Sequence, residues 1–161
     1  MSIVNKTVVV NGSLDAVWEQ VNKVGNVENW HPMVKQAPVL TANDCGIGAT
    51  RRCEFHDGTS VVEKVTASKE REMVELELSD FSMPLSRAIG TIRLKELGPE
   101  RIEVSLTMDY DVKYGPIGWL MDAAMMKPMM GRMLGQVLSG LDQFIVTGDV
   151  IENVDSLHAA A

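Results

Sequence analysis

The C-terminal third of the chain carries the longest regular pattern in the sequence. From Pro116 to about Thr147, apolar residues recur at spacings of three or four, which predicts one face of a long helix. Pro116 suits a first helical position, and Gly148 is a helix stop. Pro128 should kink or interrupt the helix, because proline removes a backbone hydrogen bond and clashes with the preceding turn. We therefore predict two segments hinged near Pro128. The predicted apolar stripe consists of Trp119, Ala123, Met126, Met130, Met133, Val137, Leu141 and Phe144.

The chain before this helix consists mainly of short segments typical of antiparallel strands. The first runs from Ile3 to Val10 and ends at the turn signal Asn11-Gly12. From Val34 onward, period-two alternation is interrupted by turn residues. The further predicted strands span residues 34–41, 48–56, 59–68, 72–79, 86–97 and 101–112.

Two short helices are predicted between the first strand and the others. Ser13 is suited to cap the first of them, which has apolar residues at helical spacing from Leu14 to Val21. The second should start after Asn26 and end near Pro32, because the residue before a proline avoids the helical region.

Length and composition favour one folded domain. The chain has 161 residues, of which 45% are hydrophobic and 23% charged, as in ordinary globular proteins. No internal repeat or linker marks a second domain. We assign residues 1–148 to a single domain and expect the weakly patterned residues 149–161 to fray.

The overall charge and the cysteine content argue against several classes of partner and setting. A net charge of −7 would repel nucleic-acid phosphates and anionic lipid headgroups, so nucleic acid is not an expected partner. No apolar run approaches the roughly 20 residues that cross a bilayer, and the N-terminus lacks a signal-peptide pattern. Cys45 and Cys53 form no CxxC pair, so a soluble protein of the reducing cytoplasm is the simplest interpretation.

Metals and cofactors are not expected either. The three histidines and two cysteines are dispersed, without HExxH or CxxC spacing. The segment Gly46-Ile47-Gly48 precedes a predicted strand rather than a helix, so it does not have the context of a phosphate-binding loop.

Four landmarks follow one another along the chain. They are residues 13–18, the tripeptide Trp30-His31-Pro32, residues 46–51 followed by 58–63, and residues 115–118. In this order they resemble the START-like (SRPBCC, or birch-pollen-allergen-type) superfamily of helix-grip proteins, which includes the polyketide cyclase/dehydrase and lipid-transport family. The resemblance covers residues 3–145 and implies an α+β helix-grip fold. In that fold a seven-stranded curved antiparallel sheet wraps around the long C-terminal helix and encloses a cavity.

Two neighbouring predicted strands supply candidate ligand-binding residues. Alternation places Arg51, Cys53 and Phe55 on one strand face, and Val61 and Glu63 on a face of the next strand. In the hormone receptors of the superfamily, a glutamate on the strand matching Glu63 faces the cavity. Arg51 and Glu63 are then candidates for a polar anchor that binds a carboxylate, hydroxyl or ketone. The alternative is an ion pair at the surface or the core edge.

Six of the eleven methionines lie in the predicted long helix. Unbranched methionine suits surfaces that repack around varied apolar ligands, and the resemblance places this helix against the cavity. Met126, Met130, Met133 and Val137 are therefore further candidate ligand-binding residues. Ordinary core packing is the alternative.

Proton-transfer groups are few. His31 lies at a corner that the resemblance places near the cavity, where it, Glu63 and Tyr110 are the candidate catalytic residues. His56 lies in a predicted turn, where solvent exposure is expected. Asp109 and Asp111 should share the solvent face of the last strand, with Tyr110 on the opposite face.

Three functions remain open on this basis. The first is binding or carriage of an apolar or aromatic small molecule, such as a polyketide, isoprenoid or lipid fragment, in the cavity. The second is a cofactor-independent polyketide cyclase, aromatase or dehydratase that uses the candidate catalytic residues. The third is a protein-interaction or chaperone-regulator module. A cavity of roughly 300 Å³ or more favours the first two over the third.

Overall fold

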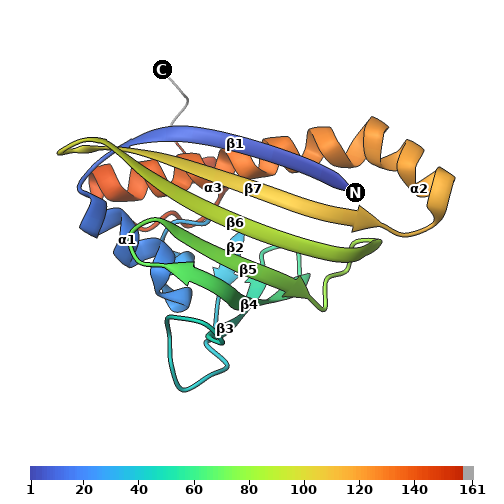
Figure 1. The fold of residues 1–161 in the computed structure, drawn as a ribbon, viewed down its shortest axis with the longest axis horizontal. Coiled ribbons are helices and arrows are strands. Elements are labelled where there is room, and N and C mark those ends of the chain that lie inside the picture. The colour runs from blue at the N-terminus through green and yellow to red at the C-terminus, as the bar shows by residue number, and fades with distance from the viewer. Residues whose placement is uncertain (158–161) are drawn as a thin grey trace.

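The structure, a computed structural model, describes residues 1–157 and contains one curved antiparallel sheet (Figure 1). Within these residues the sheet has seven strands in the order β1-β7-β6-β5-β4-β3-β2. The sheet and the long C-terminal helix confirm the predicted helix-grip fold. The elements in chain order are β1 (Ser2–Asn11), α1 (Leu14–Asn22), η1 (Val24–Asn29), β2 (Val34–Gln36), β3 (Thr50–Phe55), β4 (Ser60–Lys69), β5 (Met73–Ser79), β6 (Leu85–Gly98), β7 (Arg101–Val112), α2 (Gly115–Met121), η2 (Asp122–Met126), α3 (Lys127–Thr147) and η3 (Val154–Ser156).

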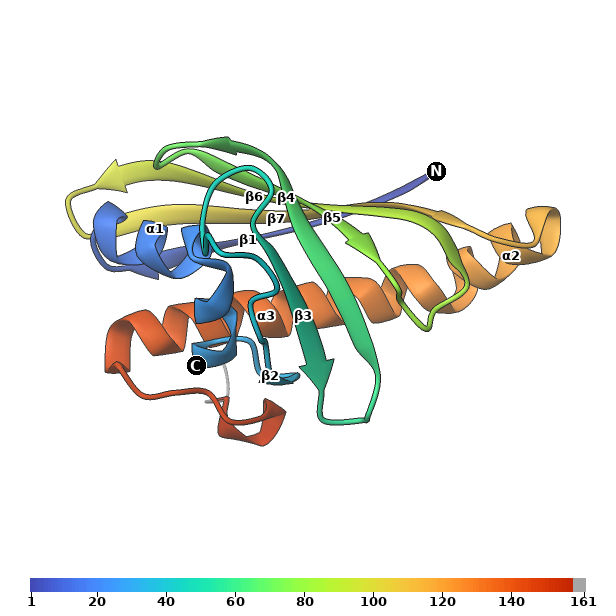
Figure 2. The ribbon, with the colours of Figure 1, turned by 90° about the horizontal axis from the view of Figure 1, so that it is seen from below.

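Strand register explains the curvature of the sheet. β4 shifts register against β5, and β6 shifts twice against β7. Such bulges bend a strand and increase its twist. Figure 2 shows the result, in which α3 lies along one face of the sheet while β3 and β4 curve past it. The concave face and α3 thus enclose the interior of the molecule.

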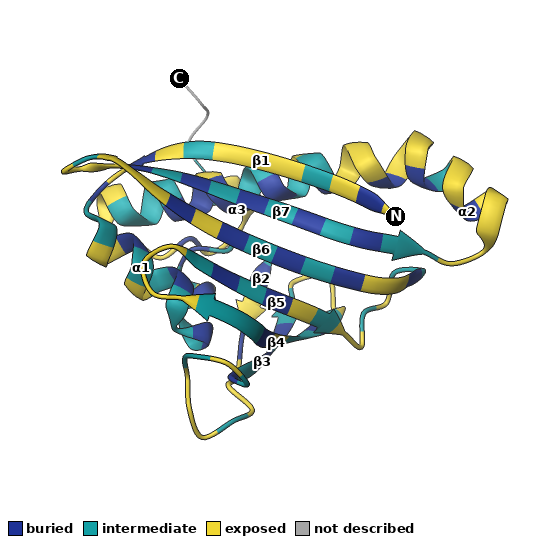
Figure 3. Cartoon of the chain, viewed as in Figure 1, coloured by how far each residue is buried: buried dark blue, intermediate teal, exposed yellow. Residues whose placement is uncertain are grey.

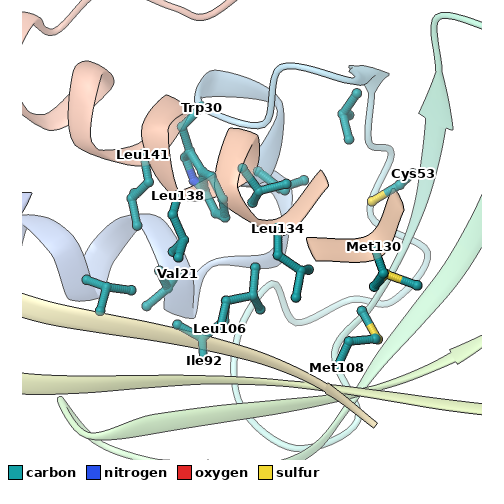
Figure 4. Packing of buried hydrophobic residues seen from close by; sticks show 14 of the residues in the cluster. Val21, Trp30, Cys53, Ile92, Leu106, Met108, Met130, Leu134, Leu138 and Leu141 are labelled. Atoms are coloured by element: carbon teal, nitrogen blue, oxygen red, sulfur yellow. The ribbon is translucent and has the colours of Figure 1, made fainter. Parts of the chain in front are cut away.

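The core is built from alternate residues of the strands and one face of α3. In β7, the even-numbered positions from 102 to 110 are buried and the residues between them are partly exposed (Figure 3), as predicted for a sheet with one buried face. Leu134, Leu138 and Leu141 of α3 pack with Trp30 and with residues from the strands (Figure 4). The alternating buried residues of β7 are Ile102, Val104, Leu106, Met108 and Tyr110.

Capping residues fix the helix ends as the sequence predicted. The backbone N–H of Ala16 donates to the Ser13 side chain at 3.1 Å, which starts α1. Gly148 adopts a left-handed φ of 75° and donates its N–H to Phe144, which ends α3. At Gly140, α3 passes very close to the end of η1. A Cβ atom added at Gly140 would lie only 2.1 Å from the Trp30 carbonyl oxygen.

The helix over residues 115–147 differs from the prediction near Pro128. The chain stays helical through the proline, and the preceding turn, η2, widens into a π-helix. A π turn accommodates the proline by relaxing the local hydrogen-bond pattern. The predicted break at Pro128 is therefore replaced by a wide turn.

The wide turn also changes which side chains are buried. Trp119 is 66% exposed and Ala123 is exposed, so the first part of the predicted stripe is wrong. Near η2 the buried residues recur every four positions. A π turn has more residues than an α-helical turn, so residues four apart stay on the same face of the helix. The buried residues of this row are Gly118, Asp122, Met126, Met130 and Leu134.

The predicted strand at residues 34–41 is shorter in the structure. β2 ends at Gln36, and beyond it Val39 makes only an isolated bridge to Arg51. Pro38 has no N–H to donate to a ladder, and the Ala37 N–H donates instead to the Glu28 carboxylate at 3.0 Å.

The segment after α3 turns back onto the domain and is anchored there by Ile151. Ile151 is 1% exposed and its N–H donates to the Asn29 carbonyl at 2.9 Å. The fraying of residues 149–161 stays a prediction, and residues 158–161 lie outside the described part. None of the helices in residues 1–157 has the length and apolar character needed to cross a membrane.

Candidate ligand cavity

A cavity of about 750 Å³ lies between the concave face of the sheet and α3. Its walls are mainly apolar, because the inward-facing residues of β5, β6 and β7 meet one face of α3. The sheet contributes Leu76, Leu78, Ala88, Gly90, Ile92, Leu106 and Met108, and the helix contributes Met129, Met130, Met133, Leu134 and Val137.

Three loops supply the more exposed residues of the lining. One is the β3–β4 turn, with His56 and Asp57, and another is the β5–β6 loop at residues 81–83. The third is the segment at residues 153–155, which follows α3. These loops, together with the exposed Met129 of α3, form the mouth of the cavity, since most of their residues are more exposed than the rest of the sheet and helix walls.

A buried ion pair forms the polar part of the wall. Arg51 Nε donates to Glu63 Oε2 at 2.5 Å, and the two side chains are only 6% and 14% exposed. Arg51 Nη1 also donates to the Val24 carbonyl, and the Cys53 thiol donates to Glu63 Oε2 at 3.3 Å. Cross-strand pairing positions this pair, because Arg51 and Glu63 are register partners in β3 and β4.

The pair stays ionised inside the protein. Burial by itself would raise the pKa of Glu63, but Arg51 and the hydrogen bonds hold that pKa below its ordinary value. Burial likewise opposes the charge of Arg51, and Glu63 more than offsets this, so the pKa of Arg51 is raised. Burial and the Glu63 carboxylate raise the pKa of the Cys53 thiol, which therefore stays protonated. Oε1 of Glu63 has no hydrogen-bond partner among residues 1–157 and is an available acceptor.

His31 lines the same cavity as a neutral side chain. Burial lowers the pKa of His31 to about 4; Glu63 opposes this change and Arg51 adds to it. The Met33 backbone N–H donates to His31 Nδ1 at 3.3 Å, so the proton of the neutral ring is on Nε2. His31 can therefore offer a hydrogen-bond donor to a ligand, whereas its lone pair is already occupied.

The structure brings most of the predicted site residues together, but not all. Cys53 is 2% exposed and contacts Glu63 instead of lining the cavity. Met126 lies in the buried row of the helix but outside the cavity wall. The predicted residues that do line the cavity are His31, Arg51, Phe55, Val61, Glu63, Met130, Met133 and Val137.

Tyr110 does not reach the cavity. Its hydroxyl donates to Asp122 Oδ1 at 2.5 Å, and Ser2 donates to the other oxygen of the same carboxylate. Burial and the Asp122 carboxylate raise the pKa of Tyr110. Tyr110 thus ties β7 to η2 and is not part of the cavity lining. Asp109 and Asp111 lie near Arg87 on the other face of β7.

Sequence reasoning missed two groups of residues. The β5–β6 loop and residues 153–155 were not predicted to reach the cavity, and no local pattern marks them. Asp122 was also missed, because its burial depends on the wide turn at η2, which a helical period of 3.6 residues does not predict. No group of three or more potential metal-ligating side chains is found within residues 1–157.

The sequence matches the polyketide cyclase/dehydrase and lipid transport family over residues 1–144. No curated protein matches the sequence significantly. The structure resembles XoxI from Bacillus cereus, with a TM-score of 0.75 and 17% identity, covering 91% of this chain and 97% of XoxI.

Two plant proteins have the same fold. Ginseng major latex-like protein 151 from Panax ginseng has a TM-score of 0.71 at 13% identity, covering 90% of this chain and 97% of that protein. Norcoclaurine synthase from Thalictrum flavum, in complex with a transition-state analogue, has a TM-score of 0.68 at 12% identity, covering 91% and 95%. With a family match over nearly the whole sequence and the helix-grip fold, the chain belongs to the polyketide cyclase/dehydrase and lipid transport family of the START-like superfamily.

Proposed function

We propose that this protein binds and carries an apolar or aromatic small molecule that has one polar group. The observation that carries the proposal is the cavity of about 750 Å³ with mainly apolar walls and a buried Arg51–Glu63 pair. Small-molecule sites typically have volumes of about 300–1,000 Å³ and a few polar groups that fix orientation. The size of the cavity also favours a function inside the molecule over a purely surface-based interaction function.

The polar wall supports a ligand that both donates and accepts hydrogen bonds. Glu63 Oε1 is a free acceptor for a hydroxyl, and neutral His31 offers the Nε2–H donor. A phenol or enol satisfies both groups, while the rest of an aromatic ligand contacts methionine and leucine side chains. Burial of its apolar surface contributes roughly 25 cal/mol per Å² to binding.

The same geometry favours binding over proton transfer. A general base needs a free lone pair and a pKa near the working pH. The pKa of His31 is about 4 and its Nδ1 accepts a backbone hydrogen bond, while the pKa of Glu63 is held low by Arg51. A cyclase or dehydratase activity remains the alternative, and it requires turnover of a polyketone that falls when Glu63 is replaced.

Naphthalene and naphthol form a matched pair of probes for this site, since they differ by a single hydroxyl. The wild-type protein should bind naphthol about tenfold more tightly, because the hydroxyl gains a hydrogen bond to a charged acceptor. In the double variant Arg51→Met/Glu63→Leu, naphthalene should bind as before and the preference for naphthol should disappear. Isothermal titration calorimetry measures both affinities and should show the negative heat-capacity change of apolar burial.

A cavity-filling variant provides the matching control. A Cβ on Gly90 makes only ordinary contacts with Met108 and Leu78, so Gly90→Phe should fill the cavity and prevent binding of both probes. Gly98, at the end of the same strand, has open space around it, and Gly98→Leu should bind normally. Equal affinities of Gly90→Phe and wild type, or no binding of either probe to wild type, would refute the proposal.

A further inference from the structure

The start of the long helix has an unusually apolar exposed surface. We call residues 113–132 the helix tip. Ile117, Trp119 and Leu120 are 78%, 66% and 63% exposed, although tryptophan and the aliphatic residues are normally among the more buried types. Tyr114, Met125 and Met129 in the same stretch are also more than half exposed. Figure 3 shows this exposed surface on α2.

The helix tip is held in place while remaining uncovered. α2 projects past the end of the sheet, and no other described segment lies over it (Figure 2). Its inner side is fixed by Asp122, which is 1% exposed and accepts hydrogen bonds from Ser2 and Tyr110. The exposure is therefore a property of a fixed structure, and not of a loose end.

A row of apolar side chains connects the helix tip with the ligand cavity. Positions four apart lie along one side of the wide-turned helix, next to the buried row. This row ends at Met129 and Met133, which line the cavity. Met129 and Met83 also line a second hollow of about 490 Å³, next to Met121, Met125 and Arg132. The members of the row are Ile117, Met121, Met125, Met129 and Met133.

The charges of the helix tip have the opposite sign to the net charge of the chain. The whole chain carries −7, whereas the charged residues of the tip are Lys113, Asp122, Lys127 and Arg132. Since Asp122 is buried, the solvent-facing charges are all positive. Lys127 lies about 12 Å along the helix axis from Trp119 at 1.5 Å per residue. An apolar end is thus followed by cations.

We propose that the helix tip docks on the surface of an anionic lipid bilayer. Ile117, Trp119 and Leu120 would enter the interfacial region, where tryptophan is favoured. Lys113, Lys127 and Arg132 would then lie among anionic headgroups, which attract cations at the membrane surface. A second copy of this chain fits less well, because a symmetric dimer through this face would bring like charges together.

This docking places the mouth of the cavity near the bilayer. Met83 and Met129 at the mouth would face the interface, so an apolar ligand could pass between bilayer and cavity along the methionine row. This last step rests on the proposed carrier function, while the docking itself does not. Vesicle binding and probe binding therefore fail independently.

Vesicle flotation tests the docking directly. The wild-type protein should float with vesicles of phosphatidylcholine and phosphatidylglycerol at a three-to-one ratio, and much less with pure phosphatidylcholine. The triple variant Ile117→Ser/Trp119→Ser/Leu120→Ser should lose binding by about tenfold or more. Lys127→Glu/Arg132→Glu should also bind at least about tenfold more weakly, and added salt should weaken wild-type binding because it screens surface charge.

Matched controls separate the helix tip from the rest of the surface. Val39→Ser/Leu40→Ser/Ile47→Ser replaces three exposed apolar residues on another loop and should float as wild type does. Arg93→Glu/Arg101→Glu gives the same change in net charge on exposed sites of β6 and β7 and should retain most binding.

Three results would overturn the proposal. The wild-type protein could fail to float with anionic vesicles, or the tip variants could float as well as their controls. The third is a wild-type dimer in light scattering that the triple serine variant converts to a monomer, which would assign this face to a second copy. Circular dichroism verifies that every variant is folded, as expected for exposed positions.

Discussion

Arg51 and Glu63 form an ion pair that is almost fully removed from solvent. A buried pair is not necessarily stabilising, because both charges lose hydration, but removal of one partner leaves an uncompensated charge. Replacement of Glu63 by Gln should therefore lower the free energy of unfolding by about 3 kcal/mol. Urea denaturation measures this change.

Two further variants test whether the unpaired charge of Arg51 causes this loss of stability. The double variant Arg51→Met/Glu63→Leu removes both charges and should recover most of the lost stability. Glu72→Gln breaks the exposed pair with Lys69 and should change stability by no more than about 0.5 kcal/mol. If Glu63→Gln and Arg51→Met/Glu63→Leu lost similar amounts of stability, the unpaired charge of Arg51 would not be the cause of the loss.

His31 makes stability depend on pH. Its pKa is about 4 in the folded protein and about 6.5 in the unfolded chain. The unfolded state therefore binds the proton first as the pH falls, and stability is lost between about pH 6.5 and pH 4. At pH 4.5 the loss attributable to His31 should be on the order of 2 kcal/mol.

The variant His31→Asn isolates this contribution. Asparagine can still accept the hydrogen bond from the Met33 N–H, but it does not titrate. Its unfolding free energy should fall less than that of wild type between pH 7 and pH 4.5. Equal pH dependence in the two proteins would assign the effect to other groups.

At the scale of elements, the crossing of α3 over η1 depends on Gly140. A side chain there would meet the Trp30 carbonyl oxygen, which belongs to the backbone and cannot rotate away. Gly140→Ala should therefore destabilise the protein by about 2 kcal/mol. Gly135 lies on the same helix with nothing near its Cβ position, and Gly135→Ala should stabilise by about 0.5–1 kcal/mol. Thermal denaturation measures the stability of both variants. If Gly140→Ala and Gly135→Ala changed stability in the same direction, this explanation would be wrong.

The order and the ends of the elements follow closely from the local sequence. Which side chains of the long helix face the core does not. Ser13, Gly148 and the alternation in β7 act through neighbouring residues, so their roles could be predicted. The burial of Asp122 and the exposure of Trp119 depend on a wide turn before Pro128 and on partners in β1 and β7. A periodicity of 3.6 residues cannot anticipate that turn.

At the scale of the whole molecule, the cavity couples ligand binding to folding. A ligand that binds only the folded state stabilises it by about 2.7 kcal/mol when the free ligand concentration is one hundred times the dissociation constant. For a chain of this length, naphthol should then raise the melting temperature by about 5–10 °C. Differential scanning calorimetry should show this shift in wild type and Gly98→Leu, and its absence in Gly90→Phe. A shift in Gly90→Phe would place the naphthol site elsewhere.

The order of elements, the helix caps and the faces that Arg51, Cys53, Val61 and Glu63 share on β3 and β4 follow from the sequence alone, whereas it left open whether Arg51 and Glu63 form a ligand anchor or an ion pair. These features depend on residues that are close in the chain or on the two-residue period of a strand. Only the tertiary structure decided that Tyr110 and Cys53 lie outside the cavity, that residues 153–155 line its mouth, and that the helix tip is uncovered. Those outcomes depend on which distant segment lies against each side chain, and that information is present only in the folded chain.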